Sequence, residues 1–252
     1  MSSVRPIAPP APVPDPLGAL RDGELEIVGR LLDASNASFV CQVRLPCPDP
    51  EPDQVVTAVY KPIRGERPLE DFPLGTLANR EVAAFLVSEA LGWSIVPPTL
   101  LRNGPHGPGA VQLWIEADET TDPLDLLRQR TPALRRMALF DAAVNNADRK
   151  VGHLLPVAGG HVYGVDHGIC FAIEPKLRTV LWIWRGDRLT DEELASLDDL
   201  RAGLGGALGD ELSTLLSQRE IGATRRRIAD LVATGRFPQP IPGQPAVPWP
   251  PY

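Results

Sequence analysis

The sequence predicts an α+β fold of two lobes, in which an antiparallel sheet with one helix precedes a mostly helical part. Strand-like segments rich in β-branched residues concentrate in residues 17–116, and apolar residues at helical spacing dominate residues 117–237. The two ends of the chain, residues 1–16 and 238–252, are rich in proline. Such segments favour an extended, solvated backbone and cannot form a packed core, so we expect disordered tails on both sides of the two lobes. The alternative for the C-terminal tail is that Trp249 and Tyr252 dock on the folded body.

The N-terminal lobe is expected to form a small sheet with a single helix. The segment 55–61 is a β-branched run that ends before Pro62, which has no N–H to donate to a sheet. A helix is predicted over 77–91, because apolar residues recur at helical spacing and Gly92 is a natural terminator. The stretch 102–109 has the glycine and proline content of a hairpin turn. The strands are expected at 23–32, 39–44, 55–61, 99–102 and 110–116.

The C-terminal lobe is expected to be helical except for one short strand pair at about 153–156 and 161–165. A sheet lobe followed by a helical lobe leaves a cleft between them, which is where ligands commonly bind. The segment 112–116 would connect the two lobes and border this cleft. The helices are predicted at 123–130, 132–145, 191–204 and 210–234.

The composition argues against several classes of function. The formal net charge is −7 and no Lys/Arg-rich block stands out, so we expect no nucleic-acid partner. Three cysteines without Cys-x-x-Cys spacing suggest reduced thiols in a cytoplasmic protein. We expect no signal peptide, because the proline-rich N-terminus has no basic segment leading into an apolar one. We expect no integral membrane protein, because no apolar run approaches the length of a membrane span. The sequence has no Gly-x-Ser-x-Gly motif, so a serine hydrolase finds no support.

Two aspartates stand where strongly apolar segments open into loops. Asp148 follows the predicted helix 132–145, and Asp166 follows the second strand of the predicted pair. Phosphoryl transfer needs two such carboxylates, one to orient or deprotonate the incoming hydroxyl and one to carry a divalent metal. His153 lies five residues after Asp148 and can ligate a metal through a neutral nitrogen. The pattern predicts Asp148 as the catalytic residue and Asp166, with His153, as metal ligands; turn-forming aspartates are the alternative.

A lysine and a glutamate can supply the grip on a nucleotide. Lys61 ends the predicted strand 55–61, and Glu81 lies one turn before Phe85 on the apolar face of the following helix. A strand lysine that reaches phosphates and pairs with a helix glutamate is the kinase arrangement. Glu89 is the second choice of partner. Taken alone, Lys61 can equally extend to solvent as a strand-end lysine, and Glu81 can be a solvated helix charge.

The connection between the lobes is a candidate adenine site. An extended backbone there can hydrogen-bond adenine, and Trp114 or Ile115 can contact its ring, although Trp114 can also be an ordinary core residue. The residues proposed to line this part of the nucleotide site are Gln112, Trp114, Ile115 and Glu116.

With these blocks in order, the sequence resembles the phosphatidylinositol 3-/4-kinase-like superfamily, most closely its small bacterial members and the type II phosphatidylinositol 4-kinases. The resemblance runs from about Gly23 to about Asp191. Members of the superfamily have a strand ending in lysine before proline, a helix reading Arg-Glu-Val-Ala-Ala, a Val-Pro-Pro-Thr segment, an Asn-x-Asp-Arg motif and an Asp-x-Gly motif. The matching residues are Tyr60 to Pro62, Arg80 to Ala84, Val96 to Thr99, Asn146 to Arg149 and Asp166 to Gly168.

The resemblance implies a two-lobed protein-kinase-like fold, ATP with Mg²⁺ or Mn²⁺ as cofactors, and a lipid, small-molecule polyol or protein hydroxyl as acceptor. This chain departs from the family at two places. His153 stands where the family has an asparagine metal ligand, which leaves a nucleotide-binding pseudokinase or scaffold as the alternative function. Transfer of the nucleotide instead of the phosphoryl group is a fainter alternative. A glycine-rich loop is absent, so Ser35 and Ser38 are the candidates for contacting phosphate.

Overall fold

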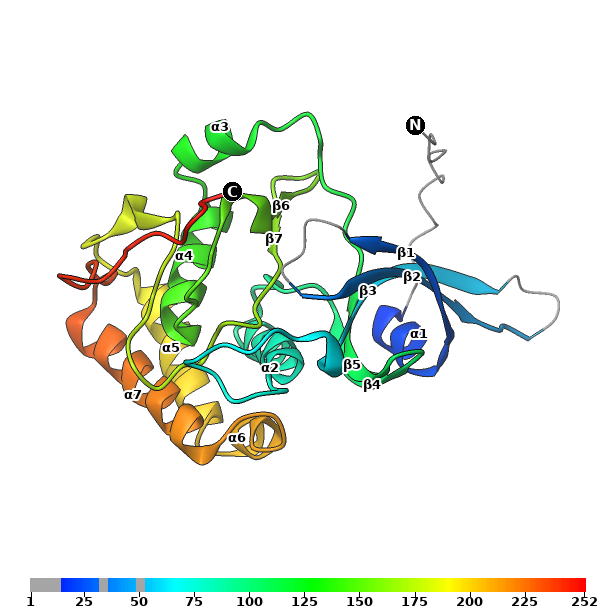
Figure 1. Cartoon of the computed structure of the whole chain (residues 1–252). Coiled ribbons are helices and arrows are strands. Elements are labelled where there is room, and N and C mark those ends of the chain that lie inside the picture. The colour runs from blue at the N-terminus through cyan, green and yellow to red at the C-terminus, as the bar shows by residue number, and fades with distance from the viewer. Residues whose placement is uncertain (1–14, 32–35, 49–52) are drawn as a thin grey trace.

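The computed structural model describes residues 15–31, 36–48 and 53–252, and it has the two lobes that the sequence predicts (Figure 1). The first lobe is a five-stranded antiparallel sheet with the strand order β1-β2-β3-β5-β4. The α+β class and the sheet lobe are therefore confirmed. The strands are β1 Glu24–Leu31, β2 Ser38–Leu45, β3 Gln54–Pro62, β4 Thr99–Gly104 and β5 Gly107–Leu113.

A short helix that the sequence analysis missed packs on this sheet. Helix α1, Pro16–Asp22, begins after Asp15, whose carboxylate accepts a hydrogen bond from the Gly18 N–H at 2.9 Å. Ala19 and Leu20 are fully buried against the sheet. Our prediction of one helix in this lobe is wrong, because an Asp cap followed by proline at the first helical position starts a helix despite the proline-rich surroundings. Residues 1–14 of the predicted N-terminal tail lie outside the described residues.

Helix α2, Leu77–Ala90, links the two lobes. Its N-terminus is capped from a distance by Glu66, whose carboxylate accepts hydrogen bonds from the N–H groups of Leu77 at 3.1 Å and Ala78 at 2.8 Å. A carboxylate at this end of a helix also complements the helix dipole. On its other side, α2 contributes to the main apolar core of the C-terminal lobe through Ala83, Ala84, Phe85 and Val87.

The C-terminal lobe is mostly helical, as expected, and its strand pair is β6 Leu154–Pro156 with β7 Val162–Gly164. The predicted helix 210–234 is wrong as a single helix. Ser217 starts a new helix there, because its side chain and that of Glu220 form a reciprocal capping box. No helix in the described ranges is long and apolar enough to cross a membrane. The helices are α3 Pro123–Arg128, α4 Pro132–Val144, α5 Asp191–Gly203, α6 Ala207–Leu212 and α7 Gln218–Thr234.

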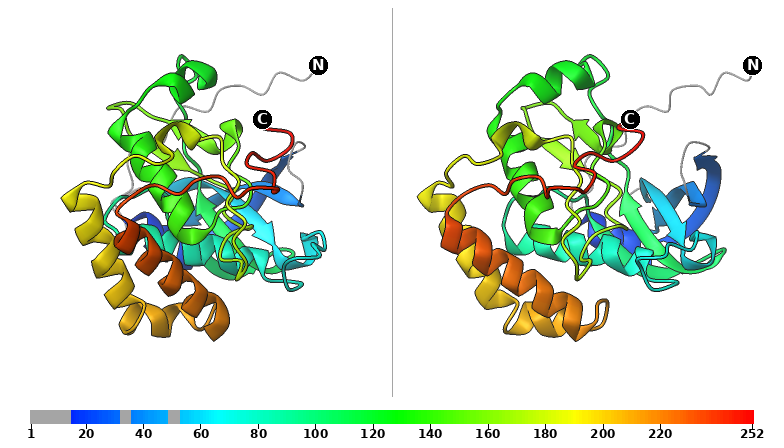
Figure 2. Two further views of the ribbon diagram at one scale, coloured as in Figure 1. Left: turned by 90° about the vertical axis from the view of Figure 1, so that its left-hand side faces the viewer. Right: turned by 60° about the vertical axis from the view of Figure 1, so that its left-hand side comes forward.

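The C-terminal segment 238–252, which we expected to be a disordered tail, lies along the C-terminal lobe (Figures 1 and 2). The Ala246 carbonyl accepts hydrogen bonds from the Thr179 N–H at 3.0 Å and the Trp182 indole N–H at 2.7 Å. The Pro251 carbonyl accepts one from the Val151 N–H at 2.9 Å. A proline-rich segment has few N–H groups to donate but keeps all its carbonyls, and these carbonyls hold the segment in place.

Candidate functional site

Lys61 and Glu81 meet between the two lobes. Alternation along β3 buries Tyr60 in the sheet core and turns Lys61 to the opposite face. The Lys61 ammonium forms a salt bridge with the Glu81 carboxylate, and it lies 3.1 Å from Oδ1 of Asp166. The structure therefore brings together three residues that are far apart in the sequence. Glu89, the second choice of partner, is exposed at the far end of α2.

The charges of this group are set by mutual attraction. Burial alone would lower the pKa of Lys61, but the carboxylates of Asp166 and Glu81 outweigh it and raise this pKa. Lys61 in turn holds the pKa of Asp166 well below its usual range, although 52% of the Asp166 side chain is exposed. Glu81 is also fixed by its second oxygen, which accepts a hydrogen bond from the His167 N–H at 3.0 Å. The lysine is thus held as a cation at neutral pH.

Asp148, His153 and Asp166 form a cluster that can hold a metal ion. One potential ligand atom from each residue lies within 4.8 Å of the others. Asp148 follows α4 after Asn145, whose left-handed conformation (φ 55°) ends the helix. His153 ends the 3₁₀ turn Val151–His153, and Asp166 follows β7. Short turns after regular elements thus direct all three side chains to one place.

The charge states of the side chains in this cluster are suited to binding a metal ion. Burial raises the pKa of the Asp148 carboxyl, and the neighbouring Lys150 opposes this effect. Burial lowers the pKa of His153 to about 4, so its imidazole is neutral at pH 7. Metal ions bind ionised carboxylates and neutral imidazole. Two carboxylates and one imidazole fit Mn²⁺ better than they fit Mg²⁺, which prefers oxygen ligands throughout.

Beneath the cluster lies a buried ion pair that the sequence analysis missed. Arg149 and Asp141 are both fully buried, and the Asp141 carboxylate accepts hydrogen bonds from Arg149 Nε at 3.0 Å and Nη2 at 2.9 Å. Asp141 also accepts a hydrogen bond from the Asn146 side-chain amide at 3.0 Å, and the Asn146 oxygen accepts from the Asp148 N–H at 2.9 Å. The loop that bears Asp148 is therefore anchored to α4. The sequence did contain one indication of this ion pair, because Asp141 is a charged residue within the apolar run of residues 137–144.

A second residue that the sequence analysis missed is Lys150. Its ammonium lies 3.3 Å from Oδ2 of Asp148, and its side chain is largely buried. A cation held in a fixed position in this way can stabilise negative charge on a bound ligand. Its position two residues after Asp148 was the only signal in the sequence.

The predicted adenine and phosphate contacts are only partly assembled. The Gln112 side-chain amide donates a hydrogen bond to the Thr99 hydroxyl at 2.8 Å within the sheet, so this side chain is already occupied. Trp114 and Ile115 are half-buried, and Glu116 is exposed. Among the described backbone hydrogen bonds, none involves the N–H of Ile115 or Glu116. Within the part of the chain that the structure describes, these two N–H groups are therefore candidates for bonding a ligand.

Ser38 lies at the start of β2. Phe39 is opposite Tyr60 in the β2–β3 register, which puts Ser38 next to Lys61 on the same face of the sheet. Its hydroxyl is buried and lies 3.5 Å from the Asn36 carbonyl. Ser35, the other candidate for contacting phosphate, lies outside the described residues.

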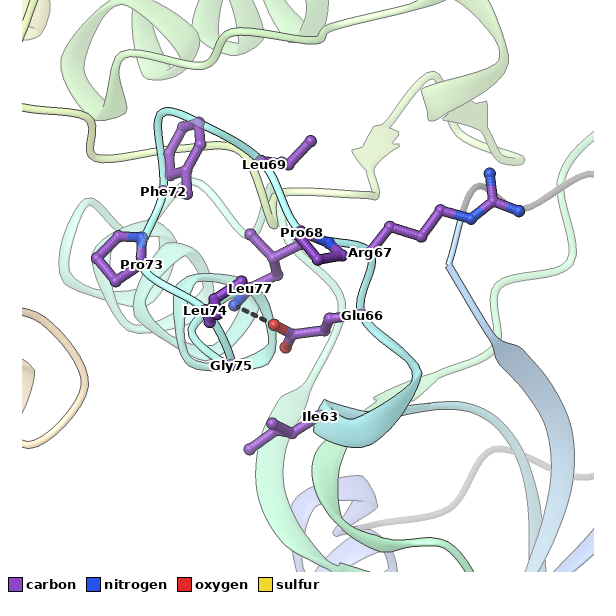
Figure 3. Close-up of a pocket in the computed structure, with 10 residues that line it drawn as sticks. All are labelled: Ile63, Glu66, Arg67, Pro68, Leu69, Phe72, Pro73, Leu74, Gly75 and Leu77. Carbon is purple, nitrogen blue, oxygen red and sulfur yellow. Dashed lines mark hydrogen bonds between the residues drawn. The ribbon is translucent and has the colours of Figure 1, made fainter.

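Figure 3 shows a surface hollow whose lining includes none of Lys61, Asp148 and Asp166. Its volume is about 190 Å³, and the loop between β3 and α2 forms most of its wall. Glu66 points to the start of α2 in this hollow and already accepts the hydrogen bond of the Leu77 N–H. Because a carboxylate occupies the helix N-terminus there, the hollow is not arranged to receive phosphate. The group around Lys61 and Asp148 is therefore the candidate functional site.

The two-lobed architecture, with a strand lysine paired to a helix glutamate, defines a kinase-like fold. The chain is 42% identical to Protein Rv2133c of Mycobacterium tuberculosis over 273 aligned residues, which cover 94% of this chain and 96% of that protein. The chain therefore belongs to the same family as Protein Rv2133c. No family model matches the sequence.

More distant similarities involve proteins of other organisms. Phosphatidylinositol 4-kinase gamma 4 of Oryza sativa subsp. japonica is 25% identical over 130 residues, which is 44% of this chain and 23% of that protein. The structure of hydra Fam20 with sugar superposes with a TM-score of 0.54 at 16% identity, covering 86% of each chain. The Helicobacter pylori proinflammatory kinase CtkA gives a TM-score of 0.45 at 13% identity, covering 84% of this chain and 98% of that one.

Proposed function

We propose that the protein is an ATP-dependent phosphotransferase of the phosphatidylinositol-kinase-like type. The observation that supports this function most directly is the meeting of Lys61, Glu81 and Asp166 within one hydrogen-bonded group, with Asp148 in the adjoining cluster. A cation fixed next to a metal-binding carboxylate and a partly buried second carboxylate are the parts that phosphoryl transfer requires. The partial similarity to a phosphatidylinositol 4-kinase agrees with the proposed type.

Each residue has a task in the proposed reaction. Lys61, oriented by Glu81, neutralises the α- and β-phosphates of ATP. Asp148 accepts the proton of the acceptor hydroxyl, for which its raised pKa is favourable. Asp166, with His153, would hold Mg²⁺ or Mn²⁺; when bound, such an ion neutralises charge on the phosphates.

The adenine would lie against the connection between the lobes. The N–H groups of Ile115 and Glu116 and the half-buried ring of Trp114 support this placement. We propose residues 17–116 as the nucleotide-gripping lobe, residues 117–237 as the lobe with the catalytic loops, and the cytoplasm as the site of action. The acceptor is a hydroxyl of a lipid, a small polyol or a protein.

A nucleotide-binding pseudokinase is the second candidate, and the surroundings of Asp166 favour it. Both of its carboxylate oxygens already face protein groups, since Oδ1 lies 3.1 Å from Lys61 and Oδ2 lies 3.4 Å from Nε2 of His153. A carboxylate engaged in this way binds a metal less readily. Binding of ATP without release or transfer of phosphate would support this candidate against the enzyme.

The test is thermal unfolding with ATP and either metal, followed by a turnover assay. A ligand at about 100 times its dissociation constant stabilises the folded state by about 2.7 kcal/mol. For a chain of this size that raises the melting temperature by about 5–10 °C. Asp166→Ala should abolish the metal-dependent part of the shift, and the matched control Asp198→Ala, which replaces a half-exposed aspartate on α5, should keep it. The absence of any shift in the wild type would refute nucleotide binding.

A further inference from the structure

We infer that Arg80 is a positioning residue, which fixes α2 so that Glu81 stays on Lys61. The inference rests on the proposed function, because it assigns a task within the same site. Arg80 and Glu81 are consecutive on α2, so their side chains diverge by about 100° around the helix axis. Glu81 points to the lysine of the sheet lobe, whereas Arg80 points to the C-terminal lobe.

The guanidinium of Arg80 is enclosed on several sides, and the residue is only 1% exposed. Nη1 donates a hydrogen bond to the Cys170 carbonyl at 2.7 Å, and Nη2 forms a salt bridge with the Glu220 carboxylate of α7. The carbon at the centre of the guanidinium lies 4.8 Å from the centroid of the Phe72 ring. A planar cation that stacks and donates in fixed directions is specific to arginine, because lysine has a single ammonium on a flexible chain.

Glu220 is itself held in place independently of Arg80. Its Oε2 accepts hydrogen bonds from the Ser217 N–H at 2.8 Å and the Ser217 hydroxyl at 2.7 Å, in the capping box that starts α7. Only Oε1 faces Arg80. The arginine therefore binds a fixed helix terminus, and the position of α7 is transmitted to α2.

The second contact of Arg80 reaches the segment that bears Asp166. Cys170 lies four residues after Asp166, and between them His167 donates its N–H to Glu81. Arg80 and Glu81, which are consecutive on α2, thus both bind the segment 166–170. Arg80 consequently joins α2, α7 and the Asp166 segment at one guanidinium.

This arrangement bears on how the site is controlled. Phosphoryl transfer in kinase-like folds requires the lysine–glutamate pair to be formed, and movement of the helix that bears the glutamate breaks it. Here the buried contacts of Arg80 hold that helix against the C-terminal lobe from within the chain. The pair of Lys61 and Glu81 is therefore the resting arrangement and needs no partner protein to form it.

The test compares two neutral double variants. Arg80→Gln/Glu220→Gln removes the contact without leaving a buried charge unpaired. The control Arg135→Gln/Glu193→Gln removes a less buried ion pair of the C-terminal lobe, with Nε–Oε1 at 2.6 Å; among the described residues, this pair has no hydrogen bond to α2. Amide hydrogen exchange without nucleotide should accelerate in residues 77–90 and 166–170 of the first variant only. Equal exchange of α2 in the two variants would overturn the inference, whether or not the protein has activity.

Turnover gives the second measurement. The Arg80→Gln/Glu220→Gln variant should lose about 100-fold in kcat, since displacement of a catalytic group by about 1 Å costs that much. Adding Glu81→Gln should reduce kcat little further in this background, and by its full factor in the control background. Additive losses would contradict a positioning role. A wild type without turnover would refute the proposed activity alone, because the exchange experiment still decides the role of Arg80. The single variant Arg80→Lys keeps the positive charge but should still have a lower kcat than the wild type, because an ammonium cannot reproduce the directed contacts of the guanidinium.

Discussion

Replacing Asp141 with asparagine should destabilise the protein by about 3 kcal/mol, although the change alters almost no volume. The reason is the charge of Arg149, which is fully buried with Asp141 as its carboxylate partner. Removal of one member of a buried ion pair costs about 3–5 kcal/mol, because the other charge is left uncompensated. We expect the lower end of this range, because the Arg149 guanidinium keeps two neutral contacts in the variant. These are the Val165 carbonyl at 3.0 Å and the His167 Nε2 at 2.6 Å.

The prediction can be measured by thermal or urea unfolding. A loss of about 3 kcal/mol lowers the melting temperature of a chain of this size by about 6–12 °C. The matched control is Asp198→Asn, which removes the partner of Arg201 in a pair whose side chains are both about half exposed. Exposed pairs contribute about 0–1 kcal/mol, so this variant should unfold close to the wild type. Equal losses in the two variants would refute the reasoning that Arg149 is left as an uncompensated buried charge.

Two further predictions concern pH and the C-terminal segment. Because the pKa of His153 is about 4 when folded and near 6.5 when unfolded, only the unfolded state gains the proton between these values, and stability should fall as pH drops from 6.5 to 4. His153→Gln should reduce this fall in the free energy of unfolding by up to about 3 kcal/mol, as measured by urea titrations at each pH. An unchanged dependence of stability on pH would argue against the role of His153. Trp182→Phe removes the indole donor to Ala246 and should cost about 1 kcal/mol, with faster proteolysis after residue 238. Cleavage there at the wild-type rate would mean that this bond does not hold the segment.

The strands and the pairing of Lys61 with Glu81 could be predicted because each depends on a local pattern. The β-branched run that ends at Pro62 places the lysine at the end of β3, and the apolar spacing of α2 indicates which helix face turns inward. The order of blocks along the chain then restricts which residues can meet. The same reasoning placed Asp148 and Asp166 in loops that follow regular elements.

The features that the sequence did not reveal depend on contacts between distant residues. The bond between Arg80 and Glu220 joins positions 140 residues apart, and no periodicity specifies it. The C-terminal segment is proline-rich like a disordered tail, yet its carbonyls meet donors presented by the folded lobe. Composition describes what a segment can do alone, whereas these contacts depend on surfaces that exist only after the rest of the chain has folded.

The contacts of His153 allow a further argument about the metal. A backbone N–H can only donate, so the Lys150 N–H, at 3.4 Å from Nδ1, makes Nδ1 an acceptor and leaves the proton on Nε2, which faces Asp166. A histidine that ligates through Nε2 normally donates its Nδ1–H to an acceptor, and that support is missing here. His153 should therefore be a weak metal ligand beside the Asp166 carboxylate. His153→Asn, which offers oxygen, should increase the Mg²⁺-dependent rise in melting temperature with ATP and change the Mn²⁺-dependent rise little. A smaller rise with Mg²⁺ in this variant would show that the imidazole is a principal ligand.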